Sequence, residues 1–226
     1  MSAERTIRLL LDTADRSEWE RLLPSFPFSG VTTNPTLLRR AGLRCDLETI
    51  GELARTAFAL GTEEMQAQGW GATTDELLRT GEAIATIDRR MVVKLPATRE
   101  GVAAARRLIA NGATVTLTAV YHPHQVLTAA ALGCRYAAPY YGRMGDEGLA
   151  AAYDIATMLT ITKDTRTRVL VASLRAAADL AFLAARGADT FALSPTIADA
   201  MLAEDLTVSA ARVFETDARE AGSEAE

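Results

Sequence analysis

Residues 91–120 read MVVKLPATREGVAAARRLIANGATVTLTAV, and this stretch decides the predicted fold. It opens with a short apolar run at 91–96, continues through an alanine- and arginine-rich stretch at 101–110, and closes with a second apolar run at 114–120. The middle stretch has apolar residues at helical spacing, and nearly continuous apolar runs are typical of parallel strands that are covered on both faces. Gly112 is placed to end the helix in a left-handed conformation. The stretch therefore predicts one strand–helix–strand unit.

The same alternation continues along the whole chain. Eight apolar runs are predicted as strands, at residues 7–12, 30–34, 65–68, 91–96, 114–120, 136–140, 169–173 and 190–194. Stretches with helical spacing lie between them, among them residues 47–60, 75–87, 101–110 and 176–185. Gly133 and Gly187 are further candidates for left-handed helix ends. Eight βα units in sequence predict an α/β fold of the closed (β/α)₈ type, the TIM barrel, with an open doubly wound sheet as the alternative.

The chain is predicted to be a single barrel domain that spans residues 1–226. A length of 226 residues suits one such barrel, and no low-complexity linker divides the sequence. Residues 208–218 predict one additional helix, which is followed by a polar end at 219–226 that we expect to fray. A helix left over after barrel closure often packs on a neighbouring subunit.

Composition excludes several classes of function. Apolar residues make up 49% of the chain, enough for a sizeable core, and the net charge is −5 without a basic patch, which argues against nucleic-acid binding. No apolar run approaches the roughly 20 residues of a membrane helix, and the N-terminus lacks the apolar region of a signal peptide. Cys45 and Cys134 are interpreted as reduced thiols of a cytoplasmic protein. The string His122-Pro123-His124 has too few ligands to predict a metal site.

Lys94 is the strongest catalytic candidate. It stands at the end of the apolar run 91–96, where burial disfavours the ammonium form and lowers the pKa of the amine from about 10.4. A neutral amine attacks carbonyl groups and forms Schiff bases. The alternative is a lysine that extends from a strand end to reach water. The second lysine of the chain, Lys163, lies in a polar turn and is the other candidate amine.

Almost every predicted strand ends in a hydrogen-bonding or ionisable group. These groups are Asp12, Thr32-Thr33-Asn34, Gln68, Lys94, Thr118, Tyr140, Ser173 and Ser194. Catalytic groups of such barrels gather at the C-terminal ends of the strands, so these side chains are expected to converge on one mouth. Each has an ordinary alternative taken singly, such as a helix cap for Asp12 or Ser173 and a turn at Asn34-Pro35.

The chemistry of these groups is mutually consistent. Condensation of an amine with a carbonyl needs a neutral amine, a group that moves protons and an anchor for hydroxyls, and Lys94, Tyr140 and Asp12 supply them in turn. Gln68 and Thr118 are placed to hold a water between Lys94 and Tyr140.

A phosphate site is predicted beside this group. Ser173 and Arg175 follow the seventh strand, where barrels often bind phosphate at helix N-termini, and Arg143 lies three residues beyond Tyr140. The alternative is that both arginines are merely solvated.

Six stretches of the chain together resemble the transaldolase family, in its small-subunit branch that contains fructose-6-phosphate aldolase. They are Leu11-Asp12-Thr13-Ala14-Asp15, Gly30-Val31-Thr32-Thr33-Asn34-Pro35-Thr36, Val93-Lys94-Leu95-Pro96-Ala97-Thr98 with Glu100-Gly101, Thr118-Ala119-Val120-Tyr121, Ala138-Pro139-Tyr140 with Arg143, and Ala172-Ser173-Leu174-Arg175. The Gly-Val-Thr-Thr-Asn-Pro string and the lysine motif are the most specific parts.

The resemblance implies a class I aldolase that needs neither a metal nor an organic cofactor. The resemblance implies that Lys94 forms a Schiff base with a dihydroxyacetone unit and that Asp12 moves protons and contacts substrate hydroxyls. It also implies that Asn34, beside Thr33, positions the intermediate. Gln68 and Thr118 are implied to hold the catalytic water with Tyr140. Arg143, Ser173 and Arg175 are implied to bind a sugar phosphate. A homo-oligomer, with a decamer as one form, is a further expectation from the resemblance.

Two positions bear on the branch member. Transaldolases resemble one another in carrying Glu at the place of Gln68 and Phe at the place of Tyr140, so this chain is similar to the aldolase type, which cleaves and forms fructose 6-phosphate. Transaldolase, which transfers the three-carbon unit between sugar phosphates, is the alternative. Deoxyribose-phosphate aldolase is a more distant rival, and an inactive barrel that binds sugar phosphate is the non-enzyme alternative. Trp70 departs from the expected pattern and leaves the substrate preference open.

Overall fold

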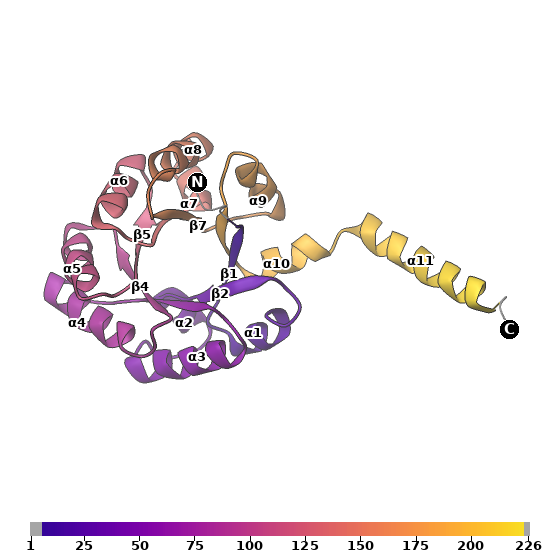
Figure 1. Ribbon diagram of the computed structural model, residues 1–226, viewed down its shortest axis with the longest axis horizontal. Helices are drawn as coiled ribbons and strands as arrows, with labels where there is room; N and C mark the ends of the chain where they lie inside the picture. Colours follow the sequence, from indigo (N-terminus) through magenta and orange to yellow (C-terminus); the bar gives the residue numbers. More distant parts are fainter. Residues whose placement is uncertain (1–5, 224–226) are drawn as a thin grey trace.

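The protein is a closed barrel of eight parallel strands surrounded by helices, as seen in a computed structural model that describes residues 6–223 (Figure 1). The strands follow one another around the barrel in sequence order, and the last pairs with the first. Their bounds are β1 (Arg8–Asp12), β2 (Phe28–Thr32), β3 (Glu64–Gln68), β4 (Met91–Pro96), β5 (Val115–Val120), β6 (Tyr136–Pro139), β7 (Arg168–Val171) and β8 (Thr190–Leu193). The predicted (β/α)₈ fold is confirmed.

Helices cover the outside of the barrel, except for the last one, which projects away from it (Figure 1). Their bounds are α1 (Arg16–Leu22), α2 (Pro35–Arg40), α3 (Leu47–Ala59), α4 (Thr74–Ala85), α5 (Arg99–Ala110), α6 (Pro123–Leu132), α7 (Tyr141–Asp146), α8 (Ala151–Thr162), α9 (Ala177–Ala184), α10 (Pro195–Leu202) and α11 (Asp205–Ser223). The main apolar core lies between the strands and these helices, and Leu11, Val93 and Leu117 are among its fully buried members. A second apolar cluster, which includes Leu10, Val92 and Leu170, is formed by the alternate residues of the strands and fills the barrel interior.

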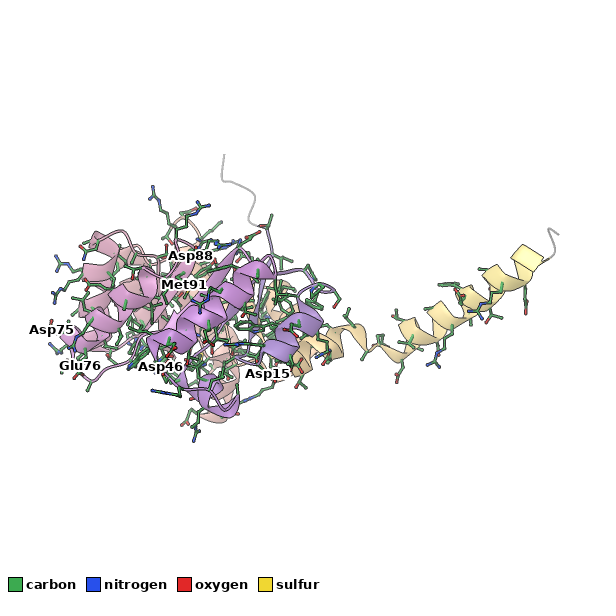
Figure 2. All side chains as sticks on the ribbon, turned by 90° about the horizontal axis from the view of Figure 1, so that it is seen from below. Asp15, Asp46, Asp75, Glu76, Asp88 and Met91 are labelled. Atoms are coloured by element: carbon green, nitrogen blue, oxygen red, sulfur yellow. The ribbon has the colours of Figure 1, made fainter. Side chains whose placement is uncertain are left out.

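Glycines follow three helices at the positions where the sequence predicts left-handed helix ends. Gly112, Gly133 and Gly187 all have positive φ values, of 85°, 77° and 95°. Asp15 and Asp46 accept backbone hydrogen bonds at the starts of α1 and α3. Figure 2 shows these two residues toward one end of the barrel, whereas Asp88 and Met91 lie toward the other. The first end therefore contains the C-terminal ends of the strands, where the candidate site is expected.

The opposite end of the barrel is closed by a buried polar network around Glu64. This carboxylate is 2% exposed, pairs with Arg8 at 3.3 Å and Arg135 at 3.1 Å, and accepts a hydrogen bond from the Tyr136 hydroxyl at 3.0 Å. A Cβ atom at Gly30 would lie 2.5 Å from the Glu64 main-chain oxygen and 2.7 Å from its Cγ. Gly30 of β2 is therefore required because β3 approaches it closely at Glu64. The network closes the end of the barrel opposite the expected site.

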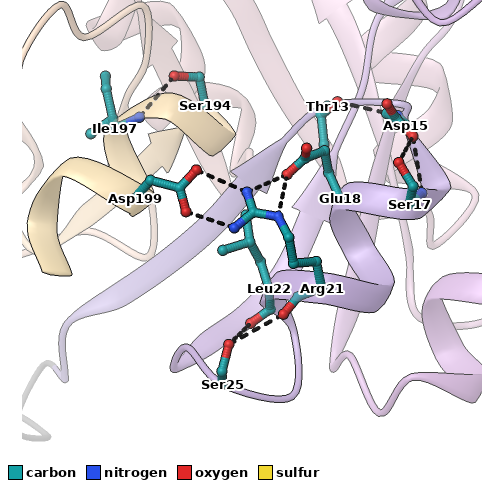
Figure 3. A network of polar contacts seen from close by, with 10 residues as sticks. All are labelled: Thr13, Asp15, Ser17, Glu18, Arg21, Leu22, Ser25, Ser194, Ile197 and Asp199. Atoms are coloured by element: carbon teal, nitrogen blue, oxygen red, sulfur yellow. Dashed lines mark hydrogen bonds and ion pairs between the residues drawn. The ribbon is translucent and has the colours of Figure 1, made fainter. Parts of the chain in front are cut away.

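A second ion-pair cluster joins the first and last βα units of the barrel. Figure 3 shows the Arg21 guanidinium between Glu18 of α1 and Asp199 of α10, with N–O distances of 2.5 and 2.7 Å. Ser194 caps α10 by accepting a hydrogen bond from the Ile197 N–H at 3.4 Å. These contacts fix α10 against α1 around the point where the barrel closes.

The C-terminal helix departs from the prediction in length. We expected a helix at 208–218 and a frayed polar end, but α11 starts at Asp205 and continues through Ser223, while residues 224–226 lie outside the described chain. Alanine, glutamate and arginine, which are good helix formers, fill the last turns of the sequence and explain the extension. The helix projects away from the barrel (Figure 1), and its apolar side chains Leu206, Val213 and Phe214 are exposed.

Candidate active site

Lys94 lies inside the barrel at the mouth, where the sequence predicts it. Its side chain is only 5% exposed, because β4 directs it into the interior. The Nζ atom donates a hydrogen bond to Thr32 Oγ1 at 2.8 Å and to the Thr33 main-chain oxygen at 3.3 Å. Both acceptors come from the end of β2, on the far side of β3. The amine therefore points across the barrel and is held at a defined position.

Burial shapes the protonation of Lys94 and Asp12. Desolvation lowers the pKa of the Lys94 amine, and the negative charge of Asp12 offsets part of this effect. Asp12 is partly exposed at the mouth, yet desolvation by the surrounding protein raises the pKa of its carboxyl. The positive charges of Lys94 and Arg143 offset part of this effect by lowering that pKa. The pair therefore contains an amine that loses its proton more readily than usual beside an acid that retains its proton more readily.

Tyr140 and Thr118 meet directly at the ends of β6 and β5, next to the Lys94 strand β4. Thr118 Oγ1 and the Tyr140 hydroxyl are 2.9 Å apart, which is a hydrogen-bond distance. The Tyr121 ring contacts the edge of the Tyr140 ring with centroids 5.9 Å apart, and the Arg143 guanidinium carbon lies 4.8 Å from the Tyr140 centroid. Ala119 has a left-handed φ of 56° at a register shift between Thr118 and Val120, near the end of β5. Tyr140 is thus held between a hydroxyl, a ring and a cation.

Three further predicted residues line this end of the strands. Gln68 is the register partner of Lys94 on the neighbouring strand β3 and is partly exposed. Asn34 accepts hydrogen bonds from the Thr36 and Leu37 N–H groups at 3.0 and 3.1 Å and thereby starts α2. The Thr33 hydroxyl is buried and has no partner among residues 6–223. Gln68 therefore neighbours the amine, while Asn34 has a structural role in addition to the one predicted for it.

The predicted phosphate residues lie on the strand β7 side. Ser173 has a left-handed φ of 59°, and its main-chain oxygen accepts a hydrogen bond from the Gly142 N–H at 2.9 Å. Ser173 is not the helix cap that was weighed as an alternative, because α9 starts after Ala176. The Arg175 guanidinium is directed to Asp146 at the end of α7, with which it forms a short ion pair. The left-handed backbone of Ser173 is costly for a non-glycine residue, and such conformations are frequent at functional sites.

Sequence reasoning named most of these residues but missed three partners. Thr32 was identified only as a strand-end residue, whereas it is the hydroxyl that holds the Lys94 amine. Asp146 and Asp179, which contact the Arg175 side chain and main chain, were not singled out. Acidic residues on exposed helices are common, and their sequence positions carry no sign of these contacts. An aspartate three residues into α9 was the one available signal of a cap.

We expect the replacement of Asp12 by asparagine to shift the titration of Lys94 toward lower pH. The Asp12 charge raises the pKa of the amine, so its loss leaves burial unopposed and the neutral amine persists to lower pH. Reductive labelling of Lys94 by a small aldehyde, followed by mass spectrometry across a pH series, measures the midpoint. Asp75→Asn, which removes an exposed carboxylate elsewhere, is the control. An unchanged or higher midpoint in Asp12→Asn would contradict this electrostatic coupling.

A closed parallel barrel with a buried amine and converging hydroxyls at its mouth has the arrangement of a barrel enzyme. Comparison with known proteins identifies the family. Residues 9–225 match the family described as Transaldolase/Fructose-6-phosphate aldolase. The chain belongs to this family.

Curated relatives agree with this assignment. A protein of Hyphomonas neptunium named "Probable transaldolase" is 30% identical over 221 residues, which cover 96% of this chain and 100% of the relative. A protein of the same name from Phenylobacterium zucineum is 31% identical and covers 93% and 96% of the two chains. "Probable transaldolase 1" of Listeria monocytogenes is 31% identical, with 93% and 97% covered. The chain is therefore an enzyme of the transaldolase family.

A solved structure supports the fold alone. Thiamine phosphate pyrophosphorylase from Pyrococcus furiosus superposes with a TM-score of 0.61 at 12% sequence identity, and the match covers 86% of this chain and 88% of that one. Within residues 6–223, no helix has the length and apolar character needed to span a membrane.

Proposed function

We propose that this enzyme forms a Schiff base between Lys94 and the carbonyl of a dihydroxyacetone unit carried by a ketose such as fructose 6-phosphate. The observation that carries the proposal is the Lys94 amine, which is buried, has a lowered pKa and is oriented by Thr32 at 2.8 Å. A neutral, fixed amine at the mouth of a barrel is the nucleophile that imine formation needs. The reaction requires neither a metal nor an organic cofactor.

The proposed steps use the groups around the amine. The amine adds to the carbonyl, and the carbinolamine takes up a proton and loses water to give the protonated imine. Removal of a proton from the substrate hydroxyl next to the scissile bond then breaks that carbon–carbon bond, and its electrons move into the imine to form an enamine. The aldehyde product leaves. Asp12, with its raised pKa, and the Tyr140–Thr118 pair at 2.9 Å are proposed to move these protons.

Two fates of the enamine are supported by different observations. The family relatives are named probable transaldolases, which supports transfer of the unit to an aldose phosphate. The Tyr140 hydroxyl supports release of dihydroxyacetone, because a proton donor beside the enamine favours protonation and hydrolysis. We propose transfer as the family activity and cleavage of fructose 6-phosphate as a second activity of the same site.

A side-by-side assay separates these activities. Fructose 6-phosphate is incubated with the enzyme with and without erythrose 4-phosphate, and free dihydroxyacetone and sedoheptulose 7-phosphate are measured. Formation of sedoheptulose 7-phosphate only in the presence of erythrose 4-phosphate supports transfer. Release of dihydroxyacetone in its absence supports cleavage. The absence of both products would contradict the proposal and favour an inactive sugar-phosphate-binding barrel.

Three expectations remain predictions. Arg143, Ser173 and Arg175 are proposed to bind the substrate phosphate, for which their place beside the mouth is the support. A homo-oligomer is proposed because the resemblance implies one and α11 exposes apolar side chains; sedimentation analysis would check it. A cytoplasmic location is supported by the two free cysteines.

A further inference from the structure

The groups on which a substrate phosphate would rest already have acidic partners within the chain. The Arg175 guanidinium donates to Asp146 Oδ2 in an ion pair. The main-chain N–H groups of Arg175 and Ala176 both donate to Asp179 Oδ2 at 3.0 Å. The guanidinium and the exposed N–H groups of a helix start are the usual ligands of phosphate in a barrel of this type. Here, two carboxylates occupy the guanidinium and the two N–H groups that immediately precede α9.

The packing of the chain directs Arg175 toward Asp146. A Cβ atom at Gly142 would lie 2.7 Å from Arg175 Nε and 3.0 Å from its Cγ, so the absence of a side chain at Gly142 lets the arginine lie against the first turn of α7. Asp146 is the last residue of the same helix, α7. The side chain therefore extends along a six-residue helix toward the carboxylate at its end.

The local charges differ from those of an ordinary anion site. Arg143 and Arg175 contribute two positive charges on this side of the mouth, and Asp146 and Asp179 contribute two negative ones. An incoming phosphate dianion must displace Asp146 from Arg175 and approach the Asp179 carboxylate at the start of α9. An uncharged aldehyde has neither cost, because the two carboxylates do not repel it and the existing ion pair need not break.

We propose that Asp146 and Asp179 are specificity-determining residues that weaken binding of phosphorylated substrates relative to unphosphorylated ones. Asp146 acts by competing for the Arg175 guanidinium, and Asp179 acts by placing a negative charge on the helix start. The proposal rests on the proposed function for its catalytic readout. It predicts that the efficiencies of this enzyme with glyceraldehyde and with glyceraldehyde 3-phosphate differ less than they would if Arg143 and Arg175 had no acidic residues beside them.

The test compares Asp146→Asn and Asp179→Asn with the unaltered enzyme. Asparagine at 179 keeps a side-chain oxygen that can accept from the Arg175 and Ala176 N–H groups, so only the charge is lost. With dihydroxyacetone as donor, the ratio of kcat/KM for glyceraldehyde 3-phosphate to that for glyceraldehyde should rise about fivefold in each variant, at the upper end of the effect of one exposed ion pair. Affinity for inorganic phosphate, measured by calorimetry, should rise in parallel.

Two controls make the result specific. Asp75→Asn breaks an exposed aspartate–arginine pair, with Arg107 at 2.9 Å, and should leave the ratio unchanged. In an Arg175→Ala background, Asp146→Asn should give no further gain, because Asp146 acts through Arg175. An unchanged ratio in both single variants would overturn the proposal. If the unaltered enzyme uses neither aldehyde with free dihydroxyacetone, the proposed aldolase activity fails, and the phosphate affinity alone then upholds or overturns this inference.

Discussion

Replacing Lys94 by arginine should lower turnover by roughly 10⁴- to 10⁶-fold, the scale seen when a covalent nucleophile is removed from an enzyme. Arginine keeps a positive charge near Asp12 but remains protonated and cannot form the imine. The Lys94 amine is held by Thr32 and Thr33 and is almost fully buried at the mouth of the barrel. Steady-state cleavage and transfer rates measure the loss.

Lys163→Arg is the matched control, because it makes the same change at the other lysine of the chain. It should retain full activity. Thermal unfolding and circular dichroism of Lys94→Arg check that the barrel is folded. Comparable activity of Lys94→Arg and the unaltered enzyme would contradict the Schiff-base assignment, and loss of activity in Lys163→Arg alone would move it to Lys163.

Replacing Tyr140 by phenylalanine should lower the release of dihydroxyacetone by about 10²- to 10⁴-fold, the contribution of a positioned general acid or base. The Tyr140 hydroxyl is 2.9 Å from Thr118 Oγ1, and we propose that it exchanges a proton with the enamine or with the leaving hydroxyl. Transfer should survive better, because an acceptor aldehyde intercepts the enamine without that proton. The ratio of transfer to cleavage should therefore rise.

Both rates are measured with fructose 6-phosphate, in the presence and absence of erythrose 4-phosphate. Tyr153→Phe removes a hydroxyl from a tyrosine that is 74% exposed on α8, and it should change neither rate. If cleavage by Tyr140→Phe is unchanged, or if both rates fall in parallel, the proton moves through another group, and Asp12 is the next candidate.

The barrel was predictable because its strands are short apolar runs that alternate with helical stretches. Several strand ends were predicted too far along the chain, each for a local reason. Asn34 leaves β2 because its side chain caps α2, Ser194 leaves β8 because it caps α10, and Ser173 leaves β7 because its backbone is left-handed. A cap and a strand end have similar sequences, since both are polar residues after an apolar run.

The candidate site was predictable to the extent that it depends on single strand ends. The placement of Lys94, Thr118, Tyr140 and Asp12 at or beside strand ends follows from the sequence alone, and their catalytic roles stay predictions. The hydrogen bond from Lys94 to Thr32 crosses the strand between them, so it depends on the curvature of the closed barrel. The Asp146–Arg175 pair depends on how α7 approaches the segment before α9, which no periodicity of the sequence encodes. The Asp179 contacts are local to the start of its own helix.

The most direct test of the Schiff-base mechanism is to trap the intermediate and locate it. The enzyme is incubated with dihydroxyacetone and borohydride, digested with a protease and analysed by mass spectrometry. We predict one reduced three-carbon adduct on the peptide that contains Lys94, and none in Lys94→Arg. An adduct on Lys163, or no adduct in an enzyme that still cleaves or transfers its substrate, would contradict the mechanism.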